Sequence, residues 1–71
     1  MVTIYGAVWC GPCQSAKLLC ETKGIEYTFI DIQQDKDAQD MFTEKGFKTV
    51  PQIFIDEEHI GGYDDLVKRG L

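Results

Sequence analysis

Hydrophobic and polar residues along the first third of the chain change from a strand pattern to a helix pattern. The β-branched and aromatic run Val2–Tyr5 predicts a strand, and residues 6–9 predict the loop after it. The residues that then recur at helical spacing are Cys13, Ala16, Leu19 and Cys20. This spacing predicts a helix with one buried face, begun by Pro12 and ended by Gly24.

The middle of the chain repeats the alternation of strand and helix. Tyr27–Ile32 is rich in β-forming residues and nearly all apolar, which predicts a central strand covered on both faces. A second helical stripe then consists of Ala38, Met41 and Phe42, and Gly46 ends it.

Two short strands and a helix are predicted for the remaining residues. Gln52–Ile55 predicts a third strand, and a turn leads from it into a short fourth strand at Ile60. After a break at residues 61–62, Asp64 and Asp65 suit the first turn of a last helix through its dipole.

The predicted order is β-α-β-α-β-β-α, which places the chain in the α/β class. A helical crossover joins the first two strands, so we expect them to be parallel with a right-handed connection. The last two strands form a hairpin. The sequence therefore predicts one domain over residues 1–71, with a four-stranded mixed sheet and helices on both faces.

Composition limits the classes of partner. The 71 residues carry 12 acidic and 7 basic side chains, a net charge of −5, so we expect neither nucleic acid nor an anionic membrane as a partner. There is no apolar run long enough to cross a bilayer, and residues 1–9 do not resemble a signal peptide. We expect a cytoplasmic monomer, in a compartment where thiols stay mostly reduced.

Cys10 and Cys13 bracket a Gly-Pro pair, and three uses of such a pair compete. A structural zinc site needs four ligands, and only Cys20 and His59 remain to complete it, so we predict no metal site. A permanent disulfide between residues three apart closes almost no loop and adds little stability. The third use, thiol–disulfide exchange, is favoured, because Cys-x-x-Cys after a strand and opening a helix is typical of redox centres.

The position of the pair at the start of a helix supports this third use. Unpaired backbone N–H groups and the positive end of the helix dipole stabilise a thiolate at Cys10. Cys13 lies one turn later on the buried face, where it can attack a mixed disulfide formed by Cys10 and release the product. Cys20 is two turns further along that face, which predicts a small core residue; a third redox or regulatory thiol is the alternative. For His59, near the turn before the fourth strand, we expect a structural role at the surface and not a catalytic one.

A second signal is the proline that precedes the third strand. Proline cannot donate to a strand ladder, so Pro51 must occupy either the first position of the strand or a special turn. A cis Val50-Pro51 bond would turn the backbone of Val50 outward, where an extended peptide can pair with it. An ordinary proline at a strand start is the alternative.

Two long stretches closely resemble glutaredoxins. "CGPCQSAKLLCETKGIEY", residues 10–27, is similar to the family's active-site helix, and "TVPQIFIDEEHIGGYDDL", residues 49–66, to its substrate-binding half. The resemblance covers residues 2–66. It implies the thioredoxin-like fold in its minimal glutaredoxin form, and a thiol–disulfide oxidoreductase that uses glutathione as co-substrate and holds no permanent cofactor.

The resemblance also implies roles for individual residues. Cys10 matches the nucleophile and Cys13 the resolving thiol. The residues that match the glutathione-binding positions are Pro12, Lys48, Thr49, Val50, Pro51, Gly62, Tyr63 and Asp64. Of these, the Thr-Val-Pro loop would pair with the glutathione backbone, Lys48 would meet its glycine carboxylate, and the loop around Asp64 would hold its γ-glutamyl end. Helix capping is the alternative for Asp64.

The tetrapeptide departs from the usual glutaredoxin pattern. Glutaredoxins usually carry Cys-Pro-Tyr-Cys, with a lysine three residues before the first cysteine. Here Cys-Gly-Pro-Cys after Trp9 resembles thioredoxins, and Ala7 stands in place of that lysine. We therefore expect a small dithiol reductant of protein disulfides and glutathione mixed disulfides, recharged by glutathione. The alternative is recharging by a thioredoxin-type flavoprotein reductase. By family association, a ribonucleotide reductase is a natural protein substrate of either.

Two other classes of function are weaker alternatives. Some glutaredoxins hold a [2Fe–2S] cluster between two subunits, but Pro12 should crowd such a cluster. A binding module without redox chemistry would not need a reactive thiol at residue 10.

Overall fold

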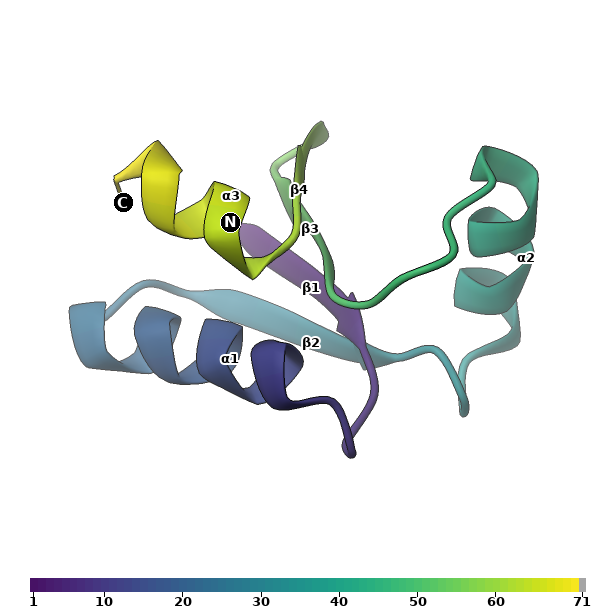
Figure 1. Ribbon diagram of the computed structural model, residues 1–71, viewed down its shortest axis with the longest axis horizontal. Coiled ribbons are helices and arrows are strands. Elements are labelled where there is room, and N and C mark those ends of the chain that lie inside the picture. Colours follow the sequence, from purple (N-terminus) through teal and green to yellow (C-terminus); the bar gives the residue numbers. More distant parts are fainter. Residues whose placement is uncertain (71) are drawn as a thin grey trace.

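The computed structural model of the protein describes residues 1–70 (Figure 1). The elements in this part of the chain are β1 (Val2–Gly6), α1 (Gly11–Lys23), β2 (Tyr27–Asp31), α2 (Lys36–Lys45), β3 (Gln52–Ile55), β4 (Glu58–Gly61) and α3 (Tyr63–Arg69). The predicted order β-α-β-α-β-β-α is confirmed, and none of the three helices within residues 1–70 is long and apolar enough to span a membrane.

The strands form a single mixed sheet in the order β2-β1-β3-β4. β1 and β2 are parallel, with Val2 opposite Tyr27, as expected for two strands joined by the helical crossover α1. β1 and β3 are antiparallel, with Ile4 opposite Ile53, and β3 and β4 form the predicted antiparallel hairpin.

The position of β2 corrects one expectation. Its apolar sequence predicts a central strand, but β2 lies at the edge of the sheet, and β1 and β3 are the central strands. Both faces of β2 are nevertheless partly covered, although none of its residues is fully buried and Thr28 is exposed. Phe29 packs against the cluster around Cys13, and Ile30 lines a pocket together with Met41 of α2. An apolar sequence therefore indicates that other elements pack over the two faces of a strand. It does not indicate whether the strand has one or two neighbouring strands in the sheet.

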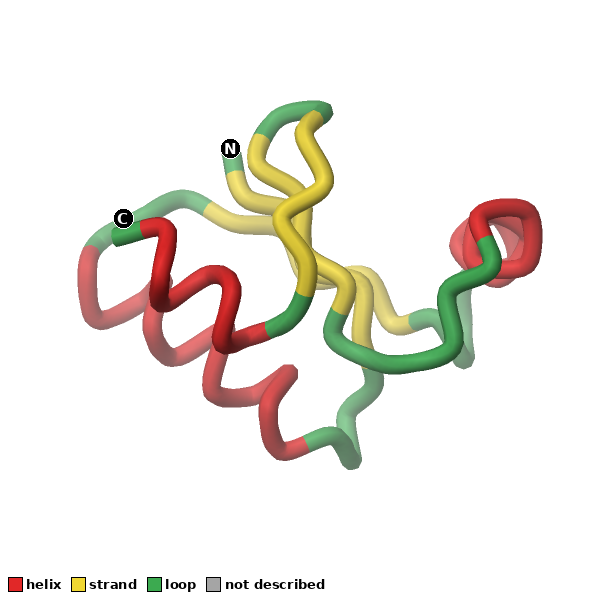
Figure 2. Tube along the Cα trace, turned by 45° about the horizontal axis from the view of Figure 1, so that its top comes forward, coloured by secondary structure: helices red, strands yellow, loops and turns green. Residues whose placement is uncertain are grey.

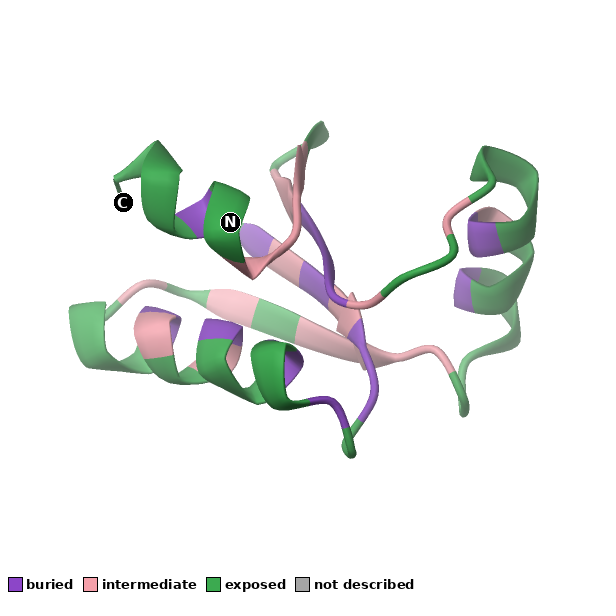
Figure 3. Ribbon diagram, viewed as in Figure 1, coloured by how far each residue is buried: buried purple, intermediate pink, exposed green. Residues whose placement is uncertain are grey.

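Helices cover both faces of the sheet, as predicted. Figure 2 shows α1 and α3 on one side of the strands and α2 on the other. The buried residues of α1 lie along one side of the helix (Figure 3), and Ala16 and Cys20 among them belong to the main core. The main core lies on this side, and its buried members are Val2, Ile4, Ala16, Cys20, Ile53 and Leu66. The expected core role of Cys20 agrees with its full burial.

The opposite face of the sheet carries a cluster of aromatic rings. Tyr5 of β1 meets Phe42 of α2 edge-on at 6.2 Å between ring centroids and Phe54 of β3 at 5.7 Å. Phe47, in the loop after α2, meets Phe42 at 5.3 Å. The ring of His59 stacks on Phe47 at 4.8 Å. This cluster attaches α2 and the loop before β3 to the sheet.

Candidate active site

The first turn of α1 holds Cys10 at its N-cap. Cys10 has extended backbone angles (φ −86°, ψ 117°), and its Sγ accepts a hydrogen bond from the backbone N–H of Cys13 at 3.2 Å. Pro12 has no N–H and a φ suited to a first helical turn, so it favours this geometry. Helix N-termini favour negative charge, so this position is compatible with the nucleophile role that the sequence predicts for Cys10.

The two thiols differ in their surroundings. Cys10 is 6% exposed, and its Sγ lies 3.7 Å from the carbonyl oxygen of Val50. Cys13 is fully buried beside Ala7 and Phe29. Burial, and next the hydrogen bond with Cys10, raises the pKa of Cys13 to about 12. Cys13 therefore stays protonated at neutral pH, and Cys10 is the more exposed of the two thiols.

Gly6, at the end of β1, makes room for the Cys13 sulfur. A Cβ at this position would lie 2.5 Å from Sγ of Cys13 and 3.2 Å from a ring carbon of Phe29. Real Cβ atoms essentially never show the first of these distances. The pair therefore depends on a residue without a side chain in the neighbouring strand.

The loop before β3 faces the cysteines. Of the two arrangements considered for Pro51, the structure has the cis Val50-Pro51 peptide bond, and β3 begins at the residue after Pro51. Pro51 is buried, whereas Lys48 and Thr49 are exposed. The contact between the carbonyl of Val50 and Sγ of Cys10 joins this loop to the start of α1 across 40 residues of sequence.

Two hollows meet at Val50. One, of about 260 Å³, is lined by Pro12, Val50, Pro51, Gly62, Tyr63, Asp64 and Asp65. The other, of about 270 Å³, is lined by Trp9, Ile32, Phe42, Phe47, Lys48, Thr49 and Val50. All eight residues that sequence reasoning assigned to glutathione line one of the two hollows, and Cys10 contacts the residue that they share. Trp9 is 68% exposed at the edge of the second hollow.

The acidic residues at the start of α3 have different partners. Helix capping is the alternative role expected for Asp64, but the residue that caps α3 is Asp65. Its Oδ2 accepts a hydrogen bond from the backbone N–H of Gly62 at 3.0 Å. The carboxylate of Asp64 is exposed, and within residues 1–70 it has no hydrogen-bond or ion-pair partner. Sequence reasoning did not assign this capping bond to Asp65. The signal was its position three residues after Gly62.

Gln52 is a second residue that sequence reasoning missed. It is the buried polar residue at the first position of β3, 9% exposed, and its side chain bonds to Thr49 and His59. The available signal was a polar side chain opening an otherwise apolar strand. A buried amide of this kind requires partners, so its neighbours are constrained as well.

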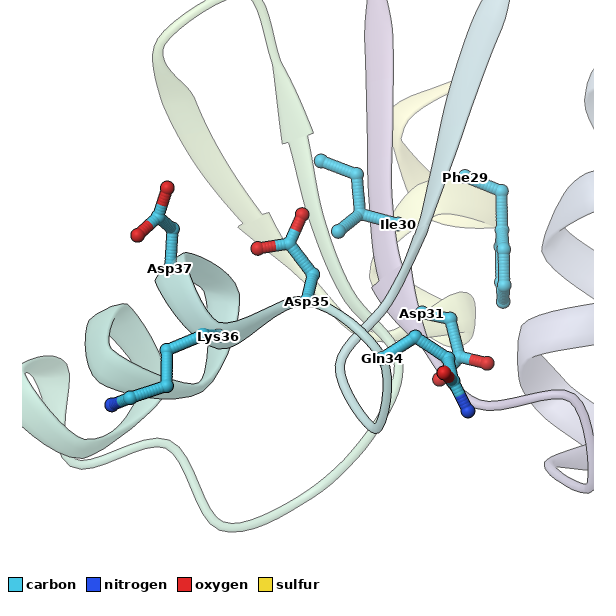
Figure 4. A pocket seen from close by; sticks show the side chains of 7 residues that line it. All are labelled: Phe29, Ile30, Asp31, Gln34, Asp35, Lys36 and Asp37. Carbon is cyan, nitrogen blue, oxygen red and sulfur yellow. The ribbon is translucent and has the colours of Figure 1, made fainter.

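Another pocket, of about 500 Å³, lies at the beginning of α2 and includes neither cysteine of the pair. Its side chains point in different directions and do not converge on one point (Figure 4). Asp35 caps α2 by accepting from the N–H of Ala38, and Asp31 accepts from the N–H of Gln33. Among residues 1–70 there is no group of three or more His, Cys, Asp or Glu side chains arranged to hold a metal ion.

Comparison with known proteins places this geometry in a family. The glutaredoxin family model matches residues 2–60. Glutaredoxin 3 of Escherichia coli is 42% identical over 66 residues, which cover 92% of this chain and 80% of the relative.

Solved structures agree on the fold. A buckwheat glutaredoxin–glutathione complex superimposes with a TM-score of 0.81 and 29% identity, over 96% of this chain and 66% of the buckwheat chain. The glutaredoxin-like protein NrdH-redoxin from Escherichia coli has a TM-score of 0.83, over 99% of this chain and 93% of its own. At 22% identity, this second likeness concerns the fold alone.

Four observations lead to one conclusion: the match to the family model, the identity to curated relatives, the thioredoxin-like fold, and the Cys-x-x-Cys pair at the start of α1. The chain belongs to the glutaredoxin family of thiol–disulfide oxidoreductases.

Proposed function

We propose that this chain reduces protein disulfides and glutathione mixed disulfides through Cys10 as nucleophile and Cys13 as resolving thiol. The thiolate of Cys10 attacks one sulfur of the substrate disulfide, and the other sulfur leaves as a thiolate. The Cys13 sulfur then attacks Sγ of Cys10, closing the Cys10–Cys13 disulfide. The second substrate thiolate leaves and takes up the proton that Cys13 gives up. Two electrons pass from the protein to the substrate.

One observation carries this proposal: Cys10 caps α1 next to the Val50 carbonyl, while Cys13 is buried behind it. The more exposed sulfur, that of Cys10, accepts an N–H bond at the start of α1. The buried sulfur keeps its proton until a mixed disulfide is in place. This order of reactivity is the order that the two-step reaction requires.

The hollow between the start of α3 and the Val50-Pro51 loop supports glutathione as the co-substrate. The exposed carboxylate of Asp64 is available to the ammonium group of a γ-glutamyl end, and Gly62 and Tyr63 line the same hollow. Lys48, exposed at the second hollow, is available to the carboxylate at the other end of the tripeptide. The backbone of Val50, between the hollows, suits pairing with the cysteine of glutathione.

Glutathione would also return the protein to its dithiol form. One glutathione thiolate attacks Cys10 of the disulfide and frees Cys13; a second attacks the glutathione sulfur and leaves oxidised glutathione with reduced protein. The observation that favours a flavoprotein reductase as the alternative is the exposed ring of Trp9 beside Cys10. Exposed aromatic rings are typical of protein–protein contacts.

The experiment that decides between the two recycling routes follows NADPH oxidation during reduction of a disulfide. One reaction contains glutathione and glutathione reductase, and the other contains thioredoxin reductase alone. Turnover only with glutathione supports the proposal, and turnover only with thioredoxin reductase supports the alternative. Turnover in neither reaction, with Cys10 unreactive toward an alkylating reagent, would refute both.

Three further expectations stay predictions. They are a ribonucleotide reductase as protein substrate, the cytoplasmic location and the monomeric state. No permanent cofactor is required, because the dithiol itself carries the two electrons.

A further inference from the structure

The side chain of Gln52 has a definite polarity. Its Nε2 lies 3.1 Å from the carbonyl oxygen of Thr49 and 3.3 Å from Oγ1 of the same residue. A carbonyl oxygen only accepts, so the amide group that faces Thr49 must be the NH₂ group. Oε1 of Gln52 therefore faces the other partner, Nε2 of His59, at 2.7 Å.

This polarity determines the role of His59. An amide oxygen only accepts, so Nε2 of His59 must carry a proton and donate it. The imidazole ring is held by stacking on Phe47 at 4.8 Å and by a tilted contact with Phe54 at 5.0 Å. The ring position is therefore set by packing, and the ring in turn sets the orientation of the Gln52 amide.

The Gln52 amide acts on the loop that meets Cys10. Thr49 is the residue before Val50, and it is exposed on the loop between α2 and β3. Gln52 donates two hydrogen bonds to Thr49, one to its backbone carbonyl and one to its hydroxyl. Because Gln52 donates to the Thr49 hydroxyl oxygen, the hydroxyl proton stays free to be donated outward.

We infer that Gln52 is a positioning residue for the oxidoreductase, with His59 as its support. Gln52 ties the loop residue Thr49 to the first residue of β3, so the intervening Val50 backbone is held in the arrangement that binds substrate. This inference rests on the proposed function, in which the backbone of Val50 pairs with the substrate. It adds a residue on the far side of the sheet from the cysteines, which contacts neither thiol.

The variant that tests the inference is Gln52→Glu. A glutamate keeps the length and shape of the side chain and still accepts from His59, but it cannot donate to Thr49. Gln52→Met removes the donor without adding a charge, in case the buried carboxylate impairs folding. His59→Phe keeps the ring stack and removes the bond to Gln52. Ile53→Val is the control, since it alters a buried neighbour in β3 that faces the other side.

The first measurement is steady-state reduction of the mixed disulfide of cysteine and glutathione, with glutathione and glutathione reductase. For both Gln52 variants we expect KM to rise about tenfold, as for two lost hydrogen bonds, with kcat within about twofold. For His59→Phe we expect a rise of about threefold. Ile53→Val should lower the thermal midpoint without changing KM. A purely structural Gln52 would behave like Ile53→Val, which would overturn the inference.

The second measurement does not require turnover. At a pH where His59 is neutral, its ¹⁵N spectrum should show a protonated Nε2. Relaxation dispersion at the Val50 amide should show exchange in Gln52→Met that wild type and Ile53→Val lack. An unprotonated Nε2, or a Val50 amide equally quiet in all variants, would overturn the inference. If the wild-type protein shows these spectra but does not turn over the substrate, only the proposed function is refuted.

Discussion

At the residue scale, the two thiols of the pair differ in how far water reaches them. Cys13 is fully buried and its pKa is raised to about 12, so at pH 8 only roughly one molecule in ten thousand has a Cys13 thiolate. Cys10 keeps 6% of its surface exposed, and its Sγ accepts an N–H bond. We expect iodoacetamide at pH 8 to alkylate Cys10 of the reduced native protein and to leave Cys13 and Cys20 unmodified, as measured by peptide mass spectrometry.

The matched control is Cys10→Ser under the same conditions. It removes the accessible thiol and keeps the buried ones, so the protein should stay unmodified until it is unfolded in denaturant. Rapid alkylation of Cys13 in this variant would contradict the assigned difference between the two thiols.

Gly6 is the residue whose missing side chain the pair needs. In Gly6→Ala the new Cβ would press on Sγ of Cys13, so we expect overpacking to lower the free energy of unfolding by about 1–3 kcal/mol. Chemical denaturation of the reduced protein measures this. Gly11→Ala is the comparison, because a Cβ there meets nothing within 4 Å and alanine suits a helix. A Gly6→Ala variant as stable as Gly11→Ala would show that the sulfur has room to move.

Sequence patterns predicted the residues whose chemistry is unusual, and missed those that act through ordinary polar bonds. Cys10, Cys13 and Pro51 stand out because few structural roles suit them at those positions. Gln52 and Asp65 are common polar residues, and their importance depends on partners that the fold supplies. Gln52 reaches His59 only because β3 and β4 form a hairpin, which places His59 opposite Phe54, two residues from Gln52 along the same strand.

At the element scale, the bounds of the helices and strands followed closely from local signals, but the position of β2 in the sheet did not. Turn and cap residues such as Gly24 and Gly46, both with positive φ, end helices by backbone geometry alone. The edge position of β2 depends on β3 pairing with β1 instead of β2. That choice is made by distant segments, so the apolar run of β2 could not reveal it.

Helix α2 is attached to the sheet mainly through two side chains, Ala38 and Phe42, which are 5% and 8% exposed. Phe42 reaches both Tyr5 of β1 and Phe47 of the loop before β3. We expect Phe42→Ala to lower the free energy of unfolding by about 3–5 kcal/mol, the usual cost of removing a buried phenyl ring. Amide hydrogen exchange should show α2 opening first while α1 stays protected.

Met41→Ala provides the comparison for α2, since Met41 lies next to Phe42 but is only partly buried. Met41→Ala should lower the free energy of unfolding by less than Phe42→Ala does. The amide exchange rates of α2 should also stay nearer to those of wild type. Equal protection of α1 and α2 in Phe42→Ala would mean that the two faces of the sheet unfold together.

At the scale of the whole molecule, the candidate site is assembled from three segments that are far apart in sequence. These segments are residues 9–13, 48–52 and 62–65. They meet because β1 and β3 are neighbours in the sheet, and because β3 leads through β4 into α3. The buried cysteines are part of the same structure that holds these segments together. The redox state of the pair should therefore influence the stability of the entire chain.

The pH dependence of stability tests this connection. In the reduced protein the pKa of Cys13 is raised from 9.0 to about 12, so between these values the unfolded chain releases a proton that the folded chain keeps. The folded state binds more protons, and stability must fall as pH rises from about 9 toward 12. In the oxidised protein Cys13 has no proton to release, so this contribution is absent.

We therefore expect reduced and oxidised protein, unfolded by urea at a series of pH values from 7 to 11, to diverge above pH 9. The reduced form should lose stability more steeply. The raised pKa values of Cys20 and Tyr27 apply to both forms and cancel in the comparison. Cys13→Ala should remove the steeper loss in the reducing series, because it removes the buried thiol that causes it. Parallel curves for reduced and oxidised protein would mean that Cys13 titrates in the folded chain as it does in the unfolded one.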